Sequence, residues 1–218
     1  KSLDLNKIEH TEKVPDDRYL GCIDEFANAI IEKFGNALVI HVHGIKNENI
    51  KEAGGKIPKG KLSHEPDELC VLLGFGQHRE KGKRRFTAED ATIRLLSQLL
   101  AQNGMPAAEA PVDPVQENDG GKNLWYCGSD TTRMNQYFYE SGLPIQSIQL
   151  EIREAGFRAS EAEAKETAQK LGRALDALLE SESKSAQADF RTTLSEIQVV
   201  KVKQIDLEDR TFEARASE

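Results

Sequence analysis

The 218-residue sequence is somewhat longer than a usual single domain, so we expect one large domain or a domain with an appendage. Hydrophobic residues make up 38% of the chain and charged residues 30%, which fits a globular protein and excludes the collagen-like and low-complexity classes. The formal net charge is −8, from 37 acidic and 29 basic residues. This balance argues against a general nucleic-acid-binding protein, because such a protein needs a basic face.

No apolar run approaches the ~18 residues that would argue for a membrane span, so we expect no membrane partner. Cys22, Cys70 and Cys127 are widely spaced and odd in number, which favours a reducing, cytoplasmic setting over a disulfide framework or a cysteine-based zinc site. The chain opens with Lys1 and shows no signal segment, which indicates a processed or excised piece.

Three segments show the apolar spacing of three and four residues that is typical of amphipathic helices. They are residues 16–34, about 88–102, and 160 to about 182. Gly35 ends the first helix, and Thr87 with Asp90 resembles a capping box at the start of the second.

Short apolar and β-branched stretches predict three buried strands. They are residues 37–43, 68–74 and 147–153. Glycine, proline and clustered basic residues predict loops between these elements. The expected loops are residues 51–61, 77–85 and 103–123. The tail is expected to form a strand at 196–206 and to return as a hairpin at 211–216.

Helices that alternate with short apolar strands point to an α/β fold. We therefore predict a three-layer α/β/α domain around a mostly parallel or mixed central sheet. Residues 1–182 are assigned to this domain. Residues 183–218 change from helix to charged strand and are expected to form a strand-containing extension packed on the same domain.

Two histidines, His41 and His43, stand at the end of the first predicted strand and are followed by Gly44. Alternate residues of an extended strand share a face, so both imidazoles are expected to point to the same side. Functional groups collect at the carboxyl edge of parallel sheets, and zinc favours imidazole ligands. The pair is therefore a candidate metal site. The alternative is that one or both histidines are hydrogen-bonded polar groups at the end of the strand.

Glu151 lies in the third predicted strand between Leu150 and Ile152. An unpaired buried charge is costly, so this carboxylate should face a cleft or a cation, where such groups often serve as general bases. The alternative is an ion pair with Arg153, which strand alternation places on the same face.

Two loops and a basic run carry weaker signals. Gly74 and His78 follow the second strand, but Arg79 stands where a nucleotide-binding G-x-G-x-x-G motif requires glycine. Residues 126–133 supply many hydrogen-bond donors. The basic residues between 81 and 85 are expected to form either a solvated loop or a binding site for an acidic substrate.

Five short segments occur in a recognisable order, and together with the helices between and after them they cover roughly residues 3–180. They are LDLNK (3–7), ALVIHVHG (37–44), EPDELCVLLG (65–74), YCGSDTTR (126–133) and IQSIQLEIREAGFR (145–158). This series resembles the N-formylglutamate amidohydrolase family, a branch of the zinc carboxypeptidase-like hydrolases. The resemblance implies a zinc-dependent amidohydrolase that cleaves an amide or acyl bond of a small acidic substrate, such as N-formylglutamate or another N-acyl glutamate.

By this resemblance, His43 is a zinc ligand and Glu151 is the catalytic carboxylate. His41 stands where the family usually has an aspartate, so it would either support the zinc site from behind or coordinate the metal directly. Asn6 and Lys7 match an Asn-Arg pair that holds a substrate carboxylate. Lys7 keeps the charge of that arginine but loses its bidentate fork.

The amidohydrolase hypothesis gives roles to other donors. Arg153 is expected at the catalytic centre, where either Arg153 or Asn6 with Lys7 would fix a substrate carboxylate. The expected substrate-binding residues are Asn6, Lys7, His78, Asp130, Thr131 and Arg133.

The family takes two further zinc ligands, a His and a Glu, from a segment that precedes its Asp-Leu-Asn motif, which here lies at residues 4–6. A catalytic zinc site uses three protein ligands, so zinc is expected to bind weakly or not at all if that segment is missing. Two alternatives to the amidohydrolase remain open. One is a metallocarboxypeptidase-like peptidase for acidic or γ-glutamyl substrates, and the other is a catalytically inactive carboxylate-binding protein on the same fold.

Overall fold

The structure is a computed structural model that describes residues 18–57, 65–76, 79–80, 83–84, 86–111, 126–128, 134–189, 200–205 and 212–216. The chain divides into two units, Lys1–Leu178 and Leu179–Glu218. The boundary therefore falls inside the last long helix, a few residues before the boundary expected from the sequence.

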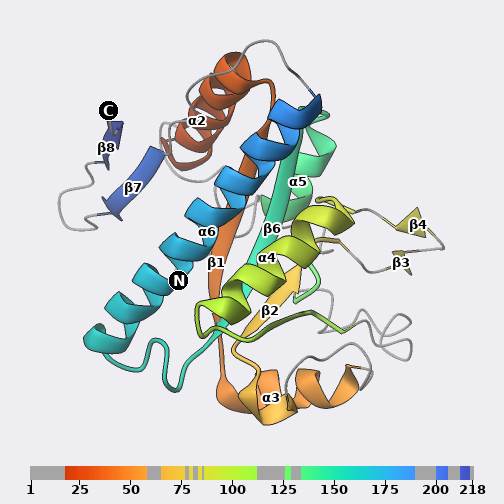
Figure 1. The fold of residues 1–218 in the computed structure, drawn as a ribbon, viewed down its shortest axis with the longest axis vertical. Coiled ribbons are helices and arrows are strands. Elements are labelled where there is room, and N and C mark those ends of the chain that lie inside the picture. Colours follow the sequence, from red (N-terminus) through yellow and green to blue (C-terminus); the bar gives the residue numbers. More distant parts are fainter. Residues whose placement is uncertain are drawn as a thin grey trace. The chain divides into compact units, whose positions relative to one another are not determined.

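The larger unit is built on a four-stranded mixed sheet with the strand order β1-β6-β2-β5 (Figure 1). Its strands are β1 (Ala37–Ile45), β2 (Val71–Gly74), β5 (Ala107–Glu109) and β6 (Ile145–Arg153). β1 is parallel to β6 and β2 is parallel to β5, whereas β2 and β6 are antiparallel. The α/β fold with a mixed, mostly parallel sheet is confirmed.

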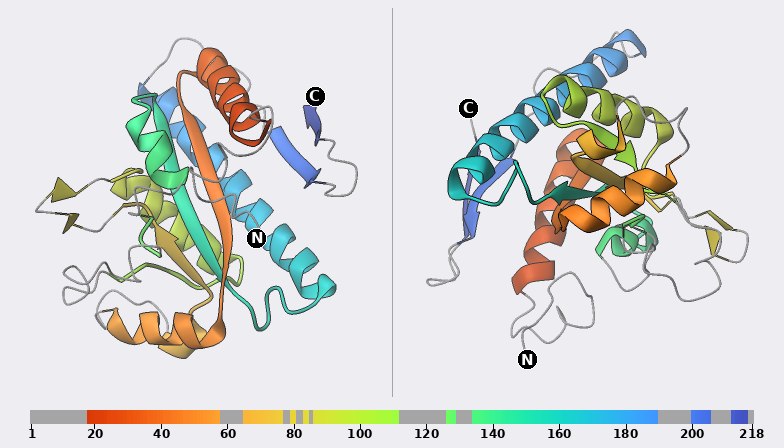
Figure 2. Two further views of the ribbon diagram at one scale, coloured as in Figure 1. Left: turned by 180° about the vertical axis from the view of Figure 1, so that it is seen from behind. Right: turned by 90° about the horizontal axis from the view of Figure 1, so that it is seen from below.

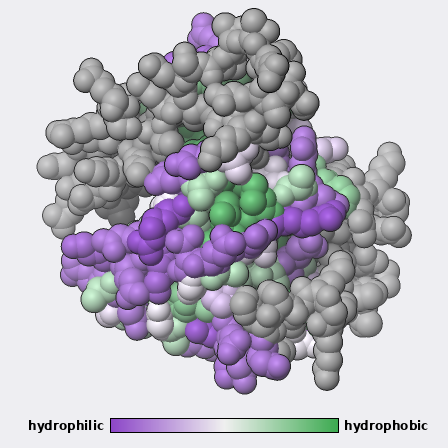
Figure 3. Space-filling model, in the orientation of Figure 1, coloured by the Kyte–Doolittle hydropathy of each residue, from purple (hydrophilic) through white to green (hydrophobic). Residues whose placement is uncertain are grey.

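One face of the sheet packs against α4 (Asp90–Gln102) and the first part of α6 (Glu161–Asp189) (Figures 1 and 2). Side chains at alternate positions of β6 meet apolar residues of both helices in one buried cluster, because alternate strand residues share a face. Its members include Ile148, Leu150, Ile152, Leu96, Leu100, Ala174 and Leu178. On the face seen in Figure 3, hydrophilic residues cover much of the coloured surface, and a patch of apolar residues shows between them.

The opposite face is covered by α2 (Arg18–Phe34), α3 (Asn47–Lys56) and α5 (Met134–Glu140) (Figure 2). Apolar residues gather here in two separate clusters. One joins Ile50 of α3 to Ile45 and Leu72. The other joins Ala27 of α2 to Phe138 of α5, with Val39 packed against them. Helices thus flank the sheet on both faces, as the sequence predicts.

Smaller elements complete the described chain. A 3₁₀ turn at Pro66–Glu68 leads into β2, and β3 (Arg79–Glu80) pairs with β4 (Lys83–Arg84). In the second unit, β7 (Val200–Ile205) and β8 (Phe212–Ala216) form an antiparallel pair, so the hairpin expected in the tail is confirmed. Within the described ranges, we find no helix with the length and apolar character needed to cross a bilayer.

The sequence predicts a loop at 51–61. This prediction is wrong for residues 51–56, because α3 continues to Lys56. Gly54 and Gly55 lower the helix propensity of this segment. Ile50 and Ala53 nevertheless bury against the neighbouring β2 region, and this tertiary packing offsets the local preference.

Two other local expectations are also wrong. β5 interrupts the loop expected at 103–123, since three residues are too few to show a period in the sequence. The capping box does not form. Glu89 is the N-cap of α4 and makes no side-chain cap, whereas Thr87 donates its hydroxyl hydrogen to the carbonyl oxygen of Ser147 at 2.6 Å.

β1 is not the buried strand that its apolar sequence predicts. It lies at the edge of the sheet and continues past His43 to Ile45. Val42 is 57% exposed as a result. An edge strand has a neighbour on one side only, so its side chains receive less cover than those of the central β6.

Candidate functional site

A band of polar side chains crosses β1 and β6 on the face covered by α3 and α5. The polar band consists of His41, His43, Ser147, Gln149 and Glu151. The parallel register pairs His41 with Gln149 and His43 with Glu151. Because alternate residues of a strand share a face, all five side chains project from the same side of the sheet.

The polar band separates the two apolar clusters of this face. Val39 and Phe138 lie at one end, and Ile45 and Leu72 lie at the other. The sequence placed the histidines at the end of the first strand, and in the structure β1 continues beyond His43 to Ile45. The polar groups therefore interrupt a sheet face that is otherwise covered by apolar side chains.

Glu151 is held inside the molecule. Only 7% of this residue is exposed, and Gln149 Nε2 donates a hydrogen bond to Glu151 Oε1 at 2.8 Å. On its other side, Glu151 is in register with Leu72 of β2. A carboxylate in such surroundings is costly unless it is hydrogen-bonded, and the Gln149 amide meets part of that need.

Tyr126 borders the carboxylate of Glu151. Burial, and then the nearby negative charge of Glu151, raise the pKa of the Tyr126 phenol, so it keeps its proton. Its hydroxyl oxygen accepts a hydrogen bond from Asn49 Nδ2 of α3 at 3.1 Å. Both residues add polar groups to the border of the band. The sequence analysis named Tyr126 only as part of the donor-rich segment 126–133, and it did not point to Asn49.

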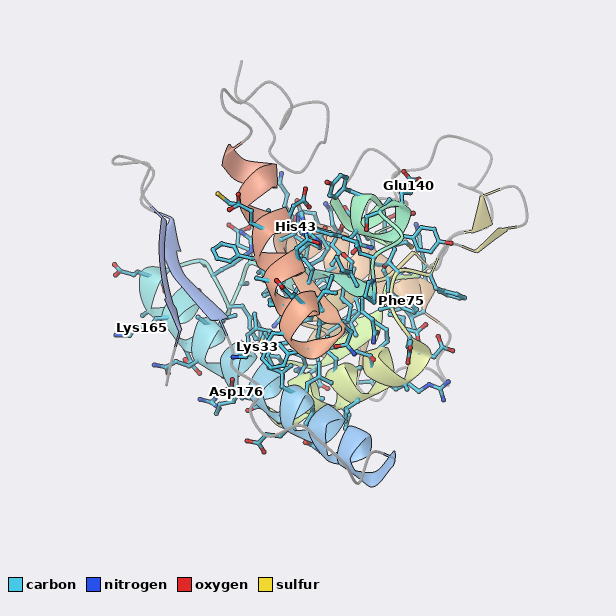
Figure 4. The ribbon with its side chains drawn as sticks, turned by 90° about the horizontal axis from the view of Figure 1, so that it is seen from above. Lys33, His43, Phe75, Glu140, Lys165 and Asp176 are labelled. Atoms are coloured by element: carbon cyan, nitrogen blue, oxygen red, sulfur yellow. The ribbon has the colours of Figure 1, made fainter. Side chains whose placement is uncertain are left out.

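His43 and Glu151 lie directly opposite each other on adjacent strands (Figure 4 labels His43). Neighbouring strands are about 4.8 Å apart, so the two side chains start close together and on one face. They can therefore contact a common ligand.

His41 makes a different set of contacts. Its Nε2 lies 3.0 Å from Ser147 Oγ, and its ring centroid lies 5.8 Å from that of Phe138. Burial, and then the neighbouring His43, lower the pKa of His41 to about 4. The ring is therefore neutral near pH 7, and its contact with Ser147 matches the sequence alternative of a hydrogen-bonded polar group.

The guanidinium group of Arg153 binds main-chain carbonyl groups. Nη1 donates to the oxygens of Asp67 at 2.9 Å and Leu69 at 3.3 Å, and Nε donates to the oxygen of Ala155 at 3.2 Å. The group also lies 5.3 Å from the ring centroid of Phe157. These contacts fasten the segment before β2 to the end of β6.

The remaining site residues expected from the sequence lie outside the described residues. They are Asn6, Lys7, His78, Asp130, Thr131 and Arg133.

Two buried residues at the start of α5 were missed by the sequence analysis. Asn135 is 2% exposed and Gln136 is fully buried, and the side-chain nitrogens of both donate to the carbonyl oxygen of Gly128, at 3.1 and 2.8 Å. Asn135 Oδ1 also lies 2.7 Å from Ser147 Oγ, which joins α5 to the polar band. Adjacent amides in a short polar stretch are common on surfaces, so no local signal marks them as buried.

A zinc ion needs more ligands than the described part of the site provides. Within that part, no three His, Cys, Asp or Glu side chains come together as possible metal ligands. His43 and Glu151 supply two donors, and Nε2 of His41 is engaged with Ser147. Catalytic zinc sites use three protein ligands. The described residues thus do not by themselves fit the zinc site that the sequence resemblance implies.

Comparison with known proteins gives one structural similarity. No protein-family model matches the chain, and no curated protein matches it. The chain is similar to the crystal structure of N-formylglutamate amidohydrolase from Ralstonia eutropha JMP134, with 16% sequence identity and a TM-score of 0.45. The similarity covers 81% of this chain and 57% of that chain, so the present sequence spans little more than half of that protein.

Proposed function

We propose that this chain is a hydrolase for a C–N bond of a small acidic substrate, with Glu151 as the general base. The observation that carries the proposal is the buried carboxylate of Glu151 in register with His43. A charge held on a sheet face between apolar clusters lowers stability unless it is compensated, which supports a role in chemistry. The motif order in the sequence supports an N-acyl glutamate as the substrate.

Each residue of the site has a part in this proposal. Glu151 takes a proton from the attacking water and later delivers it to the leaving nitrogen. Gln149 orients the carboxylate through Oε1. Tyr126 stays protonated beside Glu151 and can donate a hydrogen bond to a carbonyl oxygen that gains negative charge. His43 supplies a polar contact for the substrate next to the carboxylate.

Zinc would polarise the scissile carbonyl in a complete site of the family that the sequence resembles. Because the described residues do not form a three-ligand group, no step of this proposal depends on zinc.

The test is hydrolysis of N-formylglutamate and other N-acyl glutamates by the purified chain, with and without added Zn²⁺. Glu151→Gln removes the base and is expected to lower turnover at least 100-fold. Glu154→Gln is the matched control, because it makes the same change at an exposed position just after β6 and is expected to keep full activity. Equal turnover by the two variants would remove Glu151 from the mechanism. γ-Glutamyl and acidic peptides in the same panel test the peptidase alternative.

The two-donor arrangement among the described residues favours a second candidate, a carboxylate-binding protein without catalysis. Calorimetry with N-formylglutamate, together with metal analysis of the purified chain, separates the two candidates. Binding without turnover and without zinc supports the second. Stoichiometric zinc with turnover rules it out.

A further inference from the structure

We propose that Asn135, acting through Ser147, holds His41 with its proton on Nε2, and that Asn135 is therefore a positioning residue of the polar band. The inference deepens the proposed function and depends on it only for the catalytic consequence. It follows from which atom donates in each hydrogen bond of the series that leads from Gly128 through Asn135 and Ser147 to His41.

The amide of Asn135 can have only one orientation. Its Nδ2 donates to the carbonyl oxygen of Gly128 at 3.1 Å and to Thr87 Oγ1 at 2.9 Å, which uses both amide hydrogens. If the amide were turned over, Oδ1 would face the Gly128 carbonyl oxygen, and two acceptors would meet without a hydrogen between them. Asn135 is 2% exposed, so solvent does not compensate such a mismatch. Oδ1 therefore faces Ser147.

Thr87 supports this orientation. Its hydroxyl hydrogen is directed to the carbonyl oxygen of Ser147, which lies 2.6 Å away. A hydroxyl group has one hydrogen to donate, so Thr87 Oγ1 acts as the acceptor toward Asn135 Nδ2. The main-chain nitrogen of Ser147 in turn donates to the carbonyl oxygen of Thr87 at 2.7 Å, which keeps the two segments together.

The donor role of Ser147 toward Asn135 fixes the hydrogen on His41. Ser147 Oγ lies 2.7 Å from Asn135 Oδ1, and because Oδ1 has no hydrogen, Ser147 must donate its own. The contact of 3.0 Å between Ser147 Oγ and His41 Nε2 then requires the hydrogen of the imidazole. His41 is thus the Nε2–H tautomer. A neutral imidazole carries one ring hydrogen, so this arrangement leaves the lone pair on Nδ1.

This tautomer limits what His41 can do in the polar band. Through Nδ1, the ring can accept a hydrogen bond or donate a lone pair, but it cannot donate a proton. At Nδ1, His41 can therefore act only as an acceptor, and this is fixed by Asn135, which lies on α5 rather than on β1 or β6.

The experiment measures the tautomer directly in the full chain without substrate. Two-bond ¹H–¹⁵N correlation spectra at pH 7 are expected to show His41 with a protonated Nε2 and an unprotonated Nδ1. The opposite tautomer, or a rapid mixture of the two, would overturn the inference. Because no turnover is measured, failure of the proposed hydrolase function does not affect this result.

Variants then test the part played by Asn135. Asn135→Leu removes the acceptor that fixes the Ser147 hydroxyl, so the His41 nitrogens are expected to shift toward a mixture of tautomers. Gln136→Met is the matched control, since Gln136 also binds the Gly128 carbonyl but Asn135 provides the link to Ser147. It is expected to leave the His41 spectrum unchanged. If Asn135→Leu does not fold, Ser147→Ala removes the acceptor for Nε2 and serves the same purpose. A wild-type His41 tautomer in the folded Asn135 variant, or in the Ser147 variant that replaces it, contradicts the positioning role.

Discussion

The main chain of Tyr126 lies so close to Gly74 that a side chain on Gly74 would overlap the Tyr126 carbonyl oxygen. Gly74 is also in register with Gln149 of β6. Gly76 N donates to the carbonyl oxygen of Cys127 at 2.7 Å, which holds the 126–128 turn against the chain that follows β2. The absent side chain of Gly74 is therefore what allows this turn to bring Tyr126 beside Glu151.

Gly74→Ala is expected to destabilise the protein. The added Cβ meets main-chain atoms, which cannot rotate away, so we expect the free energy of unfolding to fall by about 3 kcal/mol. Gly172→Ala is the control, because a Cβ at this position of α6 would meet no atom within 4 Å apart from the local helix backbone. Its helix propensity should raise stability by about 1 kcal/mol. Urea denaturation measures both, and an equal effect of the two changes would contradict the packing of the turn.

The stability of the protein should depend on pH through His41. Its pKa is lowered to about 4 in the folded protein, against about 6.5 in an unfolded chain. Between these values the unfolded state binds a proton that the folded state does not, so stability falls as the pH is lowered from about 6.5 toward 4. The loss is at most about 3 kcal/mol. His41→Gln should show a shallower decline in this window and the wild-type slope above pH 7. Parallel profiles throughout would show that His41 titrates normally.

Arg153→Lys should affect stability and leave substrate binding unchanged. Lysine keeps the charge but cannot reach the carbonyl groups of Asp67, Leu69 and Ala155 together, so we expect a loss of about 1–2 kcal/mol in urea denaturation. Arg94→Lys, at an exposed position of α4, should change little. A higher KM for an N-acyl glutamate at unchanged stability would instead place Arg153 at the substrate carboxylate, which is one of the two alternatives drawn from the sequence.

The sequence predicts the helices and strands whose apolar residues recur at a regular spacing. The apolar spacing of α2, α4 and α6 and the β-branched runs at β1 and β6 are strong local patterns, and these elements appear near their expected positions. Strand alternation also places His41 with His43 on one face without knowledge of any partner strand. The sequence missed α3, α5 and β5, because their local preference is weak and tertiary packing decides their conformation.

The sequence by itself thus determined an α/β chain with two imidazoles on one strand face and a carboxylate within an apolar strand. Only the tertiary structure decided that His43 lies opposite Glu151, that β1 is an edge strand, and that Asn135 reaches Ser147. The physical reason is the range of the interactions. Periodicity reflects neighbours within a few positions, whereas strand order, register and hydrogen-bond direction join groups that are distant in the sequence and meet only when the whole sheet has formed.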